Sequence, residues 1–124
     1  MPSTVLIVDD SATMRALVRQ ALEADRHTVL EASHGAAALA ALEHAPADLV
    51  ITDVIMPEMD GLSLTRRLRE QERFRRLPVL VLTTEATPAM KESGRAAGAT
   101  GWLVKPFHPD VLRETVRRVL AERV

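Results

Sequence analysis

Acidic, ammonium and hydroxyl side chains stand at the ends of four apolar runs in the sequence. Asp9 and Asp10 follow the first run, Asp53 follows the third, Thr83 ends the fourth and Lys105 follows the fifth. Neighbouring carboxylates repel one another, and partial burial increases that repulsion. A divalent cation relieves it, and carboxylate oxygens are ligands that Mg²⁺ prefers. With metal bound, one carboxylate can attack a phosphoryl group, while the ammonium and hydroxyl groups stabilise the transferred oxygens.

Each of these residues also has an ordinary structural explanation when it is taken alone. Aspartates before a helix or after a strand are common as helix caps and turn residues. A threonine at a strand end and a lysine near the surface need no function either. Their joint placement at the ends of the first, third, fourth and fifth runs is what these explanations leave unaccounted for.

The five apolar runs predict the strands that position these side chains. They occupy residues 4–8, 28–30, 49–52, 79–83 and 101–104. None of them alternates between apolar and polar residues, which is typical of strands buried on both faces of a parallel sheet. The intervals between them, about 20–30 residues, leave room for one crossover helix each.

Helical patterns fill those intervals. A first helix begins after Ser11 as its N-cap, an alanine-rich second helix covers 36–42 and is closed by Pro46, and a third covers 62–75. The fourth runs from the Thr87-Pro88 start to Gly98, and the fifth begins near 108–110. The alternation predicts an α/β fold: a (βα)5 doubly wound, five-stranded parallel sheet of the flavodoxin-like type, with strand order 2-1-3-4-5. Ligands of such sheets bind outside the carboxyl ends of the strands, where the polar residues fall.

Composition restricts the possible classes of function. A length of 124 residues fits one domain, and the absence of cysteine excludes disulfides, thiolate metal sites and cysteine nucleophiles. A net charge of −1 argues against general binding to nucleic acid or anionic membranes. The amino terminus carries no targeting signal, and no apolar stretch approaches the roughly 18 residues that cross a bilayer. We therefore expect a cytoplasmic protein that binds no nucleic acid and does not insert into a membrane.

Several motifs resemble the receiver domain of bacterial two-component response regulators. They are LIVDDS at 6–11, DVIMPEMDG at 53–61, Thr83, and KPF at 105–107. The resemblance covers essentially the whole chain with the motifs in order, so we expect one receiver domain over residues 1–124. Segments 82–86 and 98–107 are most similar to the single-domain chemotaxis regulators called CheY-like.

The resemblance implies roles for the residues at the strand ends. Asp53 is expected to be the phosphoryl acceptor. Mg²⁺ is expected to be bound by Asp9, Asp10, Asp53 and the backbone carbonyl of Ile55. Lys105 is expected to contact the phosphoryl oxygens, and the peptide bond between Lys105 and the following Pro106 is typically cis in this family.

The resemblance also implies a switch and a site that tunes dephosphorylation. Thr83 is expected to move toward the phosphoryl group and Trp102 to rotate inward, which alters the face formed by the fourth helix, fifth strand and fifth helix. The family usually carries tyrosine or phenylalanine where Trp102 stands. Many chemotaxis members have a polar residue at the position of Ile55, beside the path of the attacking water. An apolar side chain there, facing Glu85, predicts slower hydrolysis of the phosphoaspartate.

The implied function is that of a stand-alone phosphoacceptor response regulator, not an enzyme beyond its own phosphotransfer and dephosphorylation. A sensor histidine kinase, with a chemotaxis kinase favoured, is the expected phosphodonor. Because no effector domain follows Val124, we expect a monomer whose output is protein binding, with a flagellar motor switch protein as the favoured target. A phosphate sink and a phosphorelay intermediate remain alternatives within this class.

Two alternatives come from other classes. An aspartate-nucleophile phosphatase usually has two acids one residue apart after the first strand and a cap insertion, whereas here the acids are adjacent and the chain leaves no room for a cap. A flavin-binding protein of flavodoxin type is weaker still, because the sequence lacks a phosphate-binding loop after the first strand and the aromatic residues that enclose the flavin.

Overall fold

In residues 2–85 and 87–122, which the computed structural model describes, five strands alternate with five α-helices. The strands are β1 (Thr4–Val8), β2 (Thr28–Ala32), β3 (Leu49–Asp53), β4 (Val79–Thr83) and β5 (Gly101–Val104). The helices are α1 (Ala12–Ala24), α2 (Gly35–His44), α3 (Gly61–Arg69), α4 (Pro88–Ala97) and α5 (Pro109–Ala121), with a 3-10 turn at Glu72–Phe74. Ala86, which belongs to the segment 82–86, lies outside the described residues.

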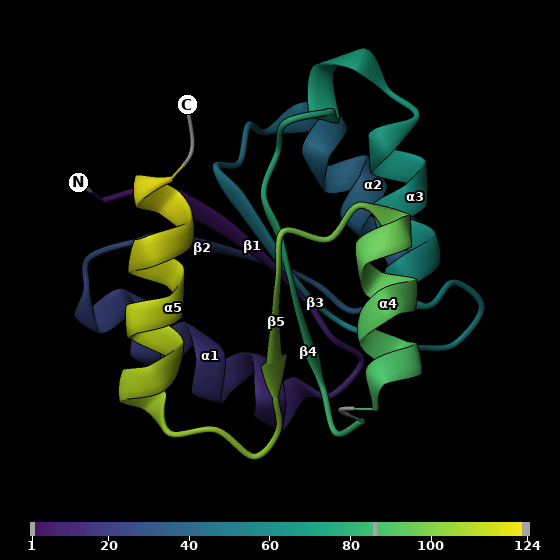
Figure 1. The fold of residues 1–124 in the computed structure, drawn as a ribbon. Helices are drawn as coiled ribbons and strands as arrows, with labels where there is room; N and C mark the ends of the chain where they lie inside the picture. Colours follow the sequence, from purple (N-terminus) through teal and green to yellow (C-terminus); the bar gives the residue numbers. More distant parts are fainter. Residues whose placement is uncertain (1, 86, 123–124) are drawn as a thin grey trace.

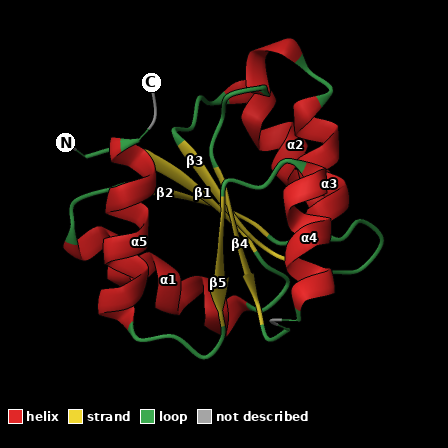
Figure 2. Ribbon diagram, in the orientation of Figure 1, coloured by secondary structure: helices red, strands yellow, loops and turns green. Residues whose placement is uncertain are grey.

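All the described strands join one parallel sheet in the order β2-β1-β3-β4-β5, which confirms the predicted flavodoxin-like topology. Figure 2 shows the twisted sheet between two layers of helices. Helices α1 and α5 cover one face, and α2, α3 and α4 cover the other (Figure 1). The strand order reverses between β1 and β3, so their carboxyl ends lie next to each other at the point where this fold binds ligands.

The two faces of the sheet explain why the strands read as continuous apolar runs. Along β1, Leu6 and Val8 pack toward the α2–α4 side, whereas Val5 and Ile7 pack toward α1 and α5. Successive strand residues point to opposite faces, so a sheet covered on both sides needs an apolar residue at every position. All five positions of β4 are buried accordingly.

The third helix is shorter than the sequence predicts. It ends at Arg69 rather than near residue 75, and a 3-10 turn follows. Leu64 and Leu68 form its fully buried stripe. One more turn at the same spacing would place Glu72 against the core, so the chain leaves the helix before that position.

The second strand is longer than predicted, reaching Ala32 rather than Leu30. Ala32 pairs with Val8 across the sheet and its side chain is buried on the α2–α4 side. Glu31 pairs with Ile7 in the register, and its carboxylate is held by arginines of α1. A polar residue within the strand is therefore compatible with the sheet because α1 provides its partners.

None of the described helices is both long enough and apolar enough to cross a membrane.

Candidate functional site

The structure brings three predicted metal-binding aspartates together at the carboxyl edge of the sheet. Asp9 and Asp10 follow β1, and Asp53 ends β3, its neighbour in the sheet. Carboxylate oxygens of the three residues lie within 4.8 Å of one another. Asp9 is buried, Asp53 is half-buried and Asp10 is exposed, so the cluster opens to solvent on one side.

Lys105 reaches this cluster from the end of β5. Its Nζ lies 3.3 Å from Asp9 Oδ2 and 3.4 Å from Asp53 Oδ2. The Lys105–Pro106 peptide bond is cis. A single ammonium beside three carboxylates leaves the cluster negatively charged, and its donors are all hard oxygen atoms. This donor set fits Mg²⁺, which takes carboxylate oxygens and retains several waters.

The environment of Asp53 makes its carboxylate less stable than a solvated one. Burial raises the pKa of Asp53 above its ordinary value, and the neighbouring charge of Asp9 adds to this effect. The Lys105 ammonium and the backbone N–H of Val54, which donates to Oδ1 at 2.8 Å, lower the pKa and offset part of the increase. An incoming positive charge is therefore favoured at Asp53.

The loop that carries Asp9 is held at three points. The backbone N–H of Ser11 donates to Asp9 Oδ1 at 2.9 Å, and the backbone N–H of Asp9 donates to the carbonyl of Ala32 at 3.1 Å. The Arg15 Nη1 donates to the Asp9 carbonyl at 2.6 Å, and its Nε pairs with Glu31 at 2.8 Å. Sequence reasoning missed Arg15 and Glu31, because helical spacing says only that Arg15 lies off the apolar stripe.

The chain after Asp53 folds back tightly over it. A Cβ at Gly61 would lie 2.0 Å from the Asp53 carbonyl oxygen, a distance that no side chain tolerates. The Gly61 N–H donates to the carbonyl of Val54 at 2.8 Å, and the Thr52 hydroxyl donates to the Asp53 carbonyl at 2.9 Å. Ile55, the residue expected to offer its carbonyl to the metal, exposes 61% of its surface at the rim of the site.

The predicted switch residues lie on one face of the sheet. The Thr83 side chain is buried, and its oxygen accepts a hydrogen bond of 3.1 Å from the backbone N–H of Glu85. The β4–β5 register pairs Val81 with Trp102 and Thr83 with Val104. Because side chains alternate along a strand, Thr83 and Trp102 point to the same side of the sheet as α4. Glu85 is exposed at the start of the loop that follows β4.

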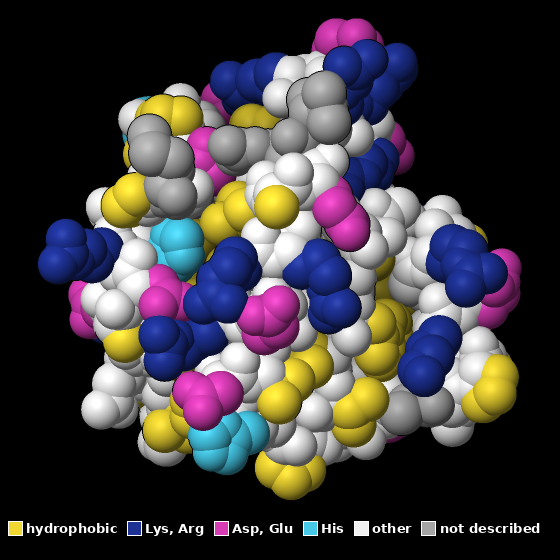
Figure 3. Space-filling model, turned by 60° about the vertical axis from the view of Figure 1, so that its left-hand side comes forward, with side chains coloured by type: hydrophobic (Ala, Val, Ile, Leu, Met, Phe, Trp, Pro, Cys, Tyr) yellow, Lys and Arg dark blue, Asp and Glu magenta, His cyan; other side chains and the backbone are white. Residues whose placement is uncertain are grey.

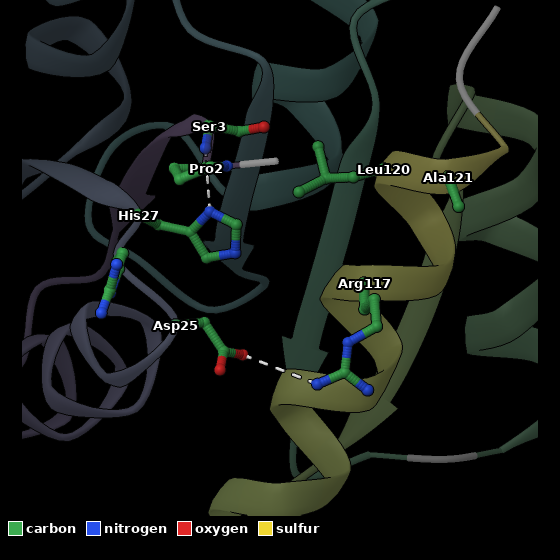
Figure 4. A pocket seen from close by; sticks show the side chains of 8 residues that line it. Pro2, Ser3, Asp25, His27, Arg117, Leu120 and Ala121 are labelled. Atoms are coloured by element: carbon green, nitrogen blue, oxygen red, sulfur yellow. Dashed lines mark hydrogen bonds and ion pairs between the residues drawn. The ribbon is translucent and has the colours of Figure 1, made fainter.

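A pocket of about 650 Å³ lies at the opposite edge of the sheet, beside the amino ends of β1 and β2 (Figure 4). Asp25 there pairs with Arg113 at 2.6 Å and with Arg117 at 3.9 Å. The His27 Nδ1 accepts a hydrogen bond from the backbone N–H of Ser3 at 3.0 Å. The Asp25 carboxylate and the His27 Nδ1 in this pocket thus each have a partner within the fold.

Comparisons with known proteins agree with this geometry. Residues 5–117 match the response regulator receiver domain. The chain is 41% identical over 118 residues to the chemotaxis protein CheY1 of Helicobacter pylori, covering 94% of this chain and 95% of that protein. The chemotaxis response regulator CheY4 of Vibrio cholerae has a TM-score of 0.91 and 43% identity, covering 96% of this chain and 99% of its own.

A second similar structure bears on the metal. The receiver domain of a sensor histidine kinase from Pseudomonas aeruginosa has a TM-score of 0.89 and 28% identity, covering 98% of this chain and all of its own. That domain was solved with a magnesium ion coordinated in its active site cleft. On the match of its sequence and the likeness of its fold, the chain belongs to the response regulator receiver domain family, whose members accept a phosphoryl group and bind Mg²⁺ at an acidic site.

Proposed function

We propose that this chain is a chemotaxis response regulator that accepts a phosphoryl group on Asp53 from a sensor histidine kinase. The observation that carries the proposal is the position of Lys105, whose ammonium lies 3.3 Å from Asp9 and 3.4 Å from Asp53. The position of Lys105 keeps Asp53 next to a cation that can also contact a transferred phosphoryl group.

The residues that hold the metal in this proposal are Asp9, Asp10, Asp53 and the backbone carbonyl of Ile55. When bound, Mg²⁺ supplies positive charge to the carboxylates and to the phosphoryl oxygens. A carboxylate oxygen of Asp53 attacks the phosphorus of a phosphohistidine, and the new O–P bond forms as the N–P bond breaks. The electron pair of the broken bond returns to the imidazole, which takes up a proton from solvent. Lys105 donates to the transferred oxygens and stabilises their charge.

Thr83 and Trp102 transmit the change in this proposal. The Thr83 oxygen accepts from a backbone N–H, so its own proton remains available to donate to a phosphoryl oxygen. Trp102 lies on the same face, on the neighbouring strand. Movement at Thr83 therefore reaches the surface formed by α4, β5 and α5. Val104 and Val111 expose 37% and 49% of their surface there, and Figure 3 shows hydrophobic side chains among charged ones on this side of the molecule.

Similarity to CheY1 and CheY4, both chemotaxis proteins by name, supports the chemotaxis assignment. We place the reaction in the cytoplasm, with a chemotaxis kinase as phosphodonor. The phosphorylated monomer binds a flagellar motor switch protein through the α4-β5-α5 surface. A protein that is labelled but captures no such target when activated would instead be a phosphate sink or a phosphorelay intermediate.

The test is stoichiometric labelling. Incubation with Mg²⁺ and a radiolabelled, phosphorylated chemotaxis kinase should label the chain at no more than one phosphoryl group per molecule. Labelling should disappear in Asp53→Asn and after chelation of Mg²⁺. The matched control is Asp60→Asn, because Asp60 caps α3 outside the acid cluster and asparagine caps equally well. Undiminished labelling of Asp53→Asn, or repeated release of phosphate from a monoester, would refute the proposal.

The partner is tested separately. Beryllofluoride, a phosphoryl analogue, is added with Mg²⁺ before the chain is mixed with purified motor switch protein. Binding should strengthen with the analogue and should not strengthen in Asp53→Asn. Equal binding with and without beryllofluoride would refute the assigned output while leaving the phosphoacceptor role intact.

A further inference from the structure

The indole of Trp102 lies directly against the backbone of α4 at Gly94. A Cβ built on Gly94 would lie 2.5 Å from Cζ3 and 2.9 Å from Cε3 of Trp102. Real Cβ atoms essentially never approach another heavy atom within 3.0 Å. A side chain at residue 94 would therefore displace the Trp102 indole, or α4 itself, from the position seen in this structure.

Nothing else about Gly94 calls for glycine. It lies inside α4, where glycine is among the least favourable residues for helix stability. The glycine that ends the same helix, Gly98, differs because its φ of 101° is a left-handed conformation that side chains rarely adopt. The space taken by the Trp102 indole is the remaining explanation for a glycine at position 94.

The indole is held by two opposing effects. Its ring is partly buried and packs against the apolar cluster on the α2–α4 side of the sheet, which favours this position. Its Nε1 is buried and has no hydrogen-bond partner among the described residues, which opposes it. An outward rotation would restore water to Nε1 at the expense of ring packing. Because these two effects oppose each other, the position of the indole is sensitive to the space that its neighbours leave.

We propose that Gly94 is a positioning residue that holds Trp102 in its inward, partly buried rotamer by leaving space on α4. Any side chain at this position would move the indole outward. The consequence for signalling rests on the proposed function, because Trp102 is there the element that links Thr83 to the α4-β5-α5 surface. In that setting Gly94 determines the fraction of molecules with Trp102 buried before any phosphoryl group arrives.

The first test is Gly94→Ala in the full chain. Trp102 is the single tryptophan of the sequence, so intrinsic fluorescence reports on its position alone. We expect the emission of Gly94→Ala to shift to longer wavelength and its acrylamide quenching constant to rise at least twofold, with an unchanged far-ultraviolet circular dichroism spectrum. The control is Ser93→Ala, which improves helix propensity one residue away and should leave both readouts at their original values. Unchanged emission and quenching in Gly94→Ala would overturn the proposal.

A double-mutant cycle separates steric exclusion from loss of helix stability. Alanine favours a helix over glycine by about fivefold in the folding equilibrium constant. In a Trp102→Leu background, where the indole is absent, Gly94→Ala should raise the folding equilibrium constant by about this factor. When Trp102 is present, the same substitution should leave the folding equilibrium constant unchanged or lower it. Equal effects in both backgrounds would show that Trp102 is not the reason for the glycine. Should Gly94→Ala alone fail to fold, recovery in the Trp102→Leu background would still support the proposal, and no recovery would reject it.

Beryllofluoride distinguishes this inference from the proposed function. If the unmodified protein with Mg²⁺ shows no change in Trp102 fluorescence on adding beryllofluoride, the proposed switch fails, while a shift in Gly94→Ala still supports the role of Gly94. If beryllofluoride changes the Trp102 fluorescence of the unmodified protein, and Gly94→Ala has the same fluorescence as that protein before and after the addition, the proposed switch stands and the role of Gly94 is rejected.

Discussion

Replacing Asp53 by asparagine should stabilise the fold when no metal is present. Asparagine keeps the shape of the side chain and an oxygen that can accept from the Val54 N–H, but it removes one of three negative charges. A carboxyl whose pKa rises on folding stabilises the folded state only below its unfolded pKa, and this contribution is lost as pH rises through the folded pKa. The raised pKa of Asp53, caused first by burial, therefore means that its ionised form destabilises the folded protein at pH 7.

The magnitude follows from the distances in the site. At an effective dielectric constant of about 20, two like charges at the 4.8 Å limit repel by about 3.5 kcal/mol, and the Lys105–Asp53 pair at 3.4 Å attracts by about 5 kcal/mol. Asp9 and Asp10 both repel the Asp53 carboxylate, but Asp10 is exposed and solvent screens its charge. The summed repulsion from these two residues therefore nearly cancels the attraction to Lys105. Burial of the carboxylate then decides the sign, and we expect a net gain on the order of 2 kcal/mol for Asp53→Asn.

The assay is thermal and urea unfolding at pH 7 with EDTA present. For a chain of 124 residues a gain of about 2 kcal/mol corresponds to a rise in Tm of roughly 8 °C. Saturating Mg²⁺ should remove this advantage, because a ligand at one hundred times its Kd stabilises the protein that binds it by about 2.7 kcal/mol. An Asp53→Asn protein that is no more stable than the original in EDTA would refute the electrostatic description of the site.

Three further predictions use single substitutions. Asp25→Asn should lower stability by roughly 0.5–1 kcal/mol at pH 7. The hydrogen bond from Arg113 lowers the pKa of Asp25 in the folded protein. The stabilisation that ionised Asp25 provides is therefore present above its unfolded pKa and is lost as pH falls through its folded pKa. The urea midpoints of Asp25→Asn and of the original protein should accordingly converge in acid. Gly61→Ala should reduce stability by at least about 2 kcal/mol and weaken Mg²⁺ binding in calorimetry, because its Cβ would meet the Asp53 carbonyl. Ile55→Asn should accelerate phosphate release from phosphorylated protein, and an unchanged rate would contradict the proposed role of this apolar side chain.

The sequence predicted the strands and their order because few alternatives satisfy its pattern. Continuous apolar runs require helices on both faces of a sheet, and short right-handed crossovers leave a small number of topologies. The bounds of β1, β4 and β5 agree with the runs 4–8, 79–83 and 101–104. The end of α3 was predicted wrongly because arginine and glutamate are good helix formers, whereas the helix ends where its buried stripe would have reached Glu72.

Candidate residues for the site could also be predicted, because each follows a strand and parallel strands place their carboxyl ends at one edge. The contacts between them could not. Lys105 lies 96 positions from Asp9 in the chain, and its distance to that carboxylate depends on the packing of β5 and on the chain that leads away from it. The hydrogen bond from Arg15 to the Asp9 carbonyl likewise depends on where Glu31 of β2 comes to lie against α1.

By itself, then, the sequence determined which residue types reach the carboxyl edge of the sheet, since the apolar pattern is local and the topology follows from it. Only the tertiary structure decided how they are held: the half-burial of Asp53, the close fold of Gly61 over it, and the space at Gly94 that admits Trp102. These features arise from side chains of different elements packed at fixed distances. In a densely packed interior, shifts of tenths of an ångström decide whether side chains fit together, and the pattern of residues along the chain does not specify such distances.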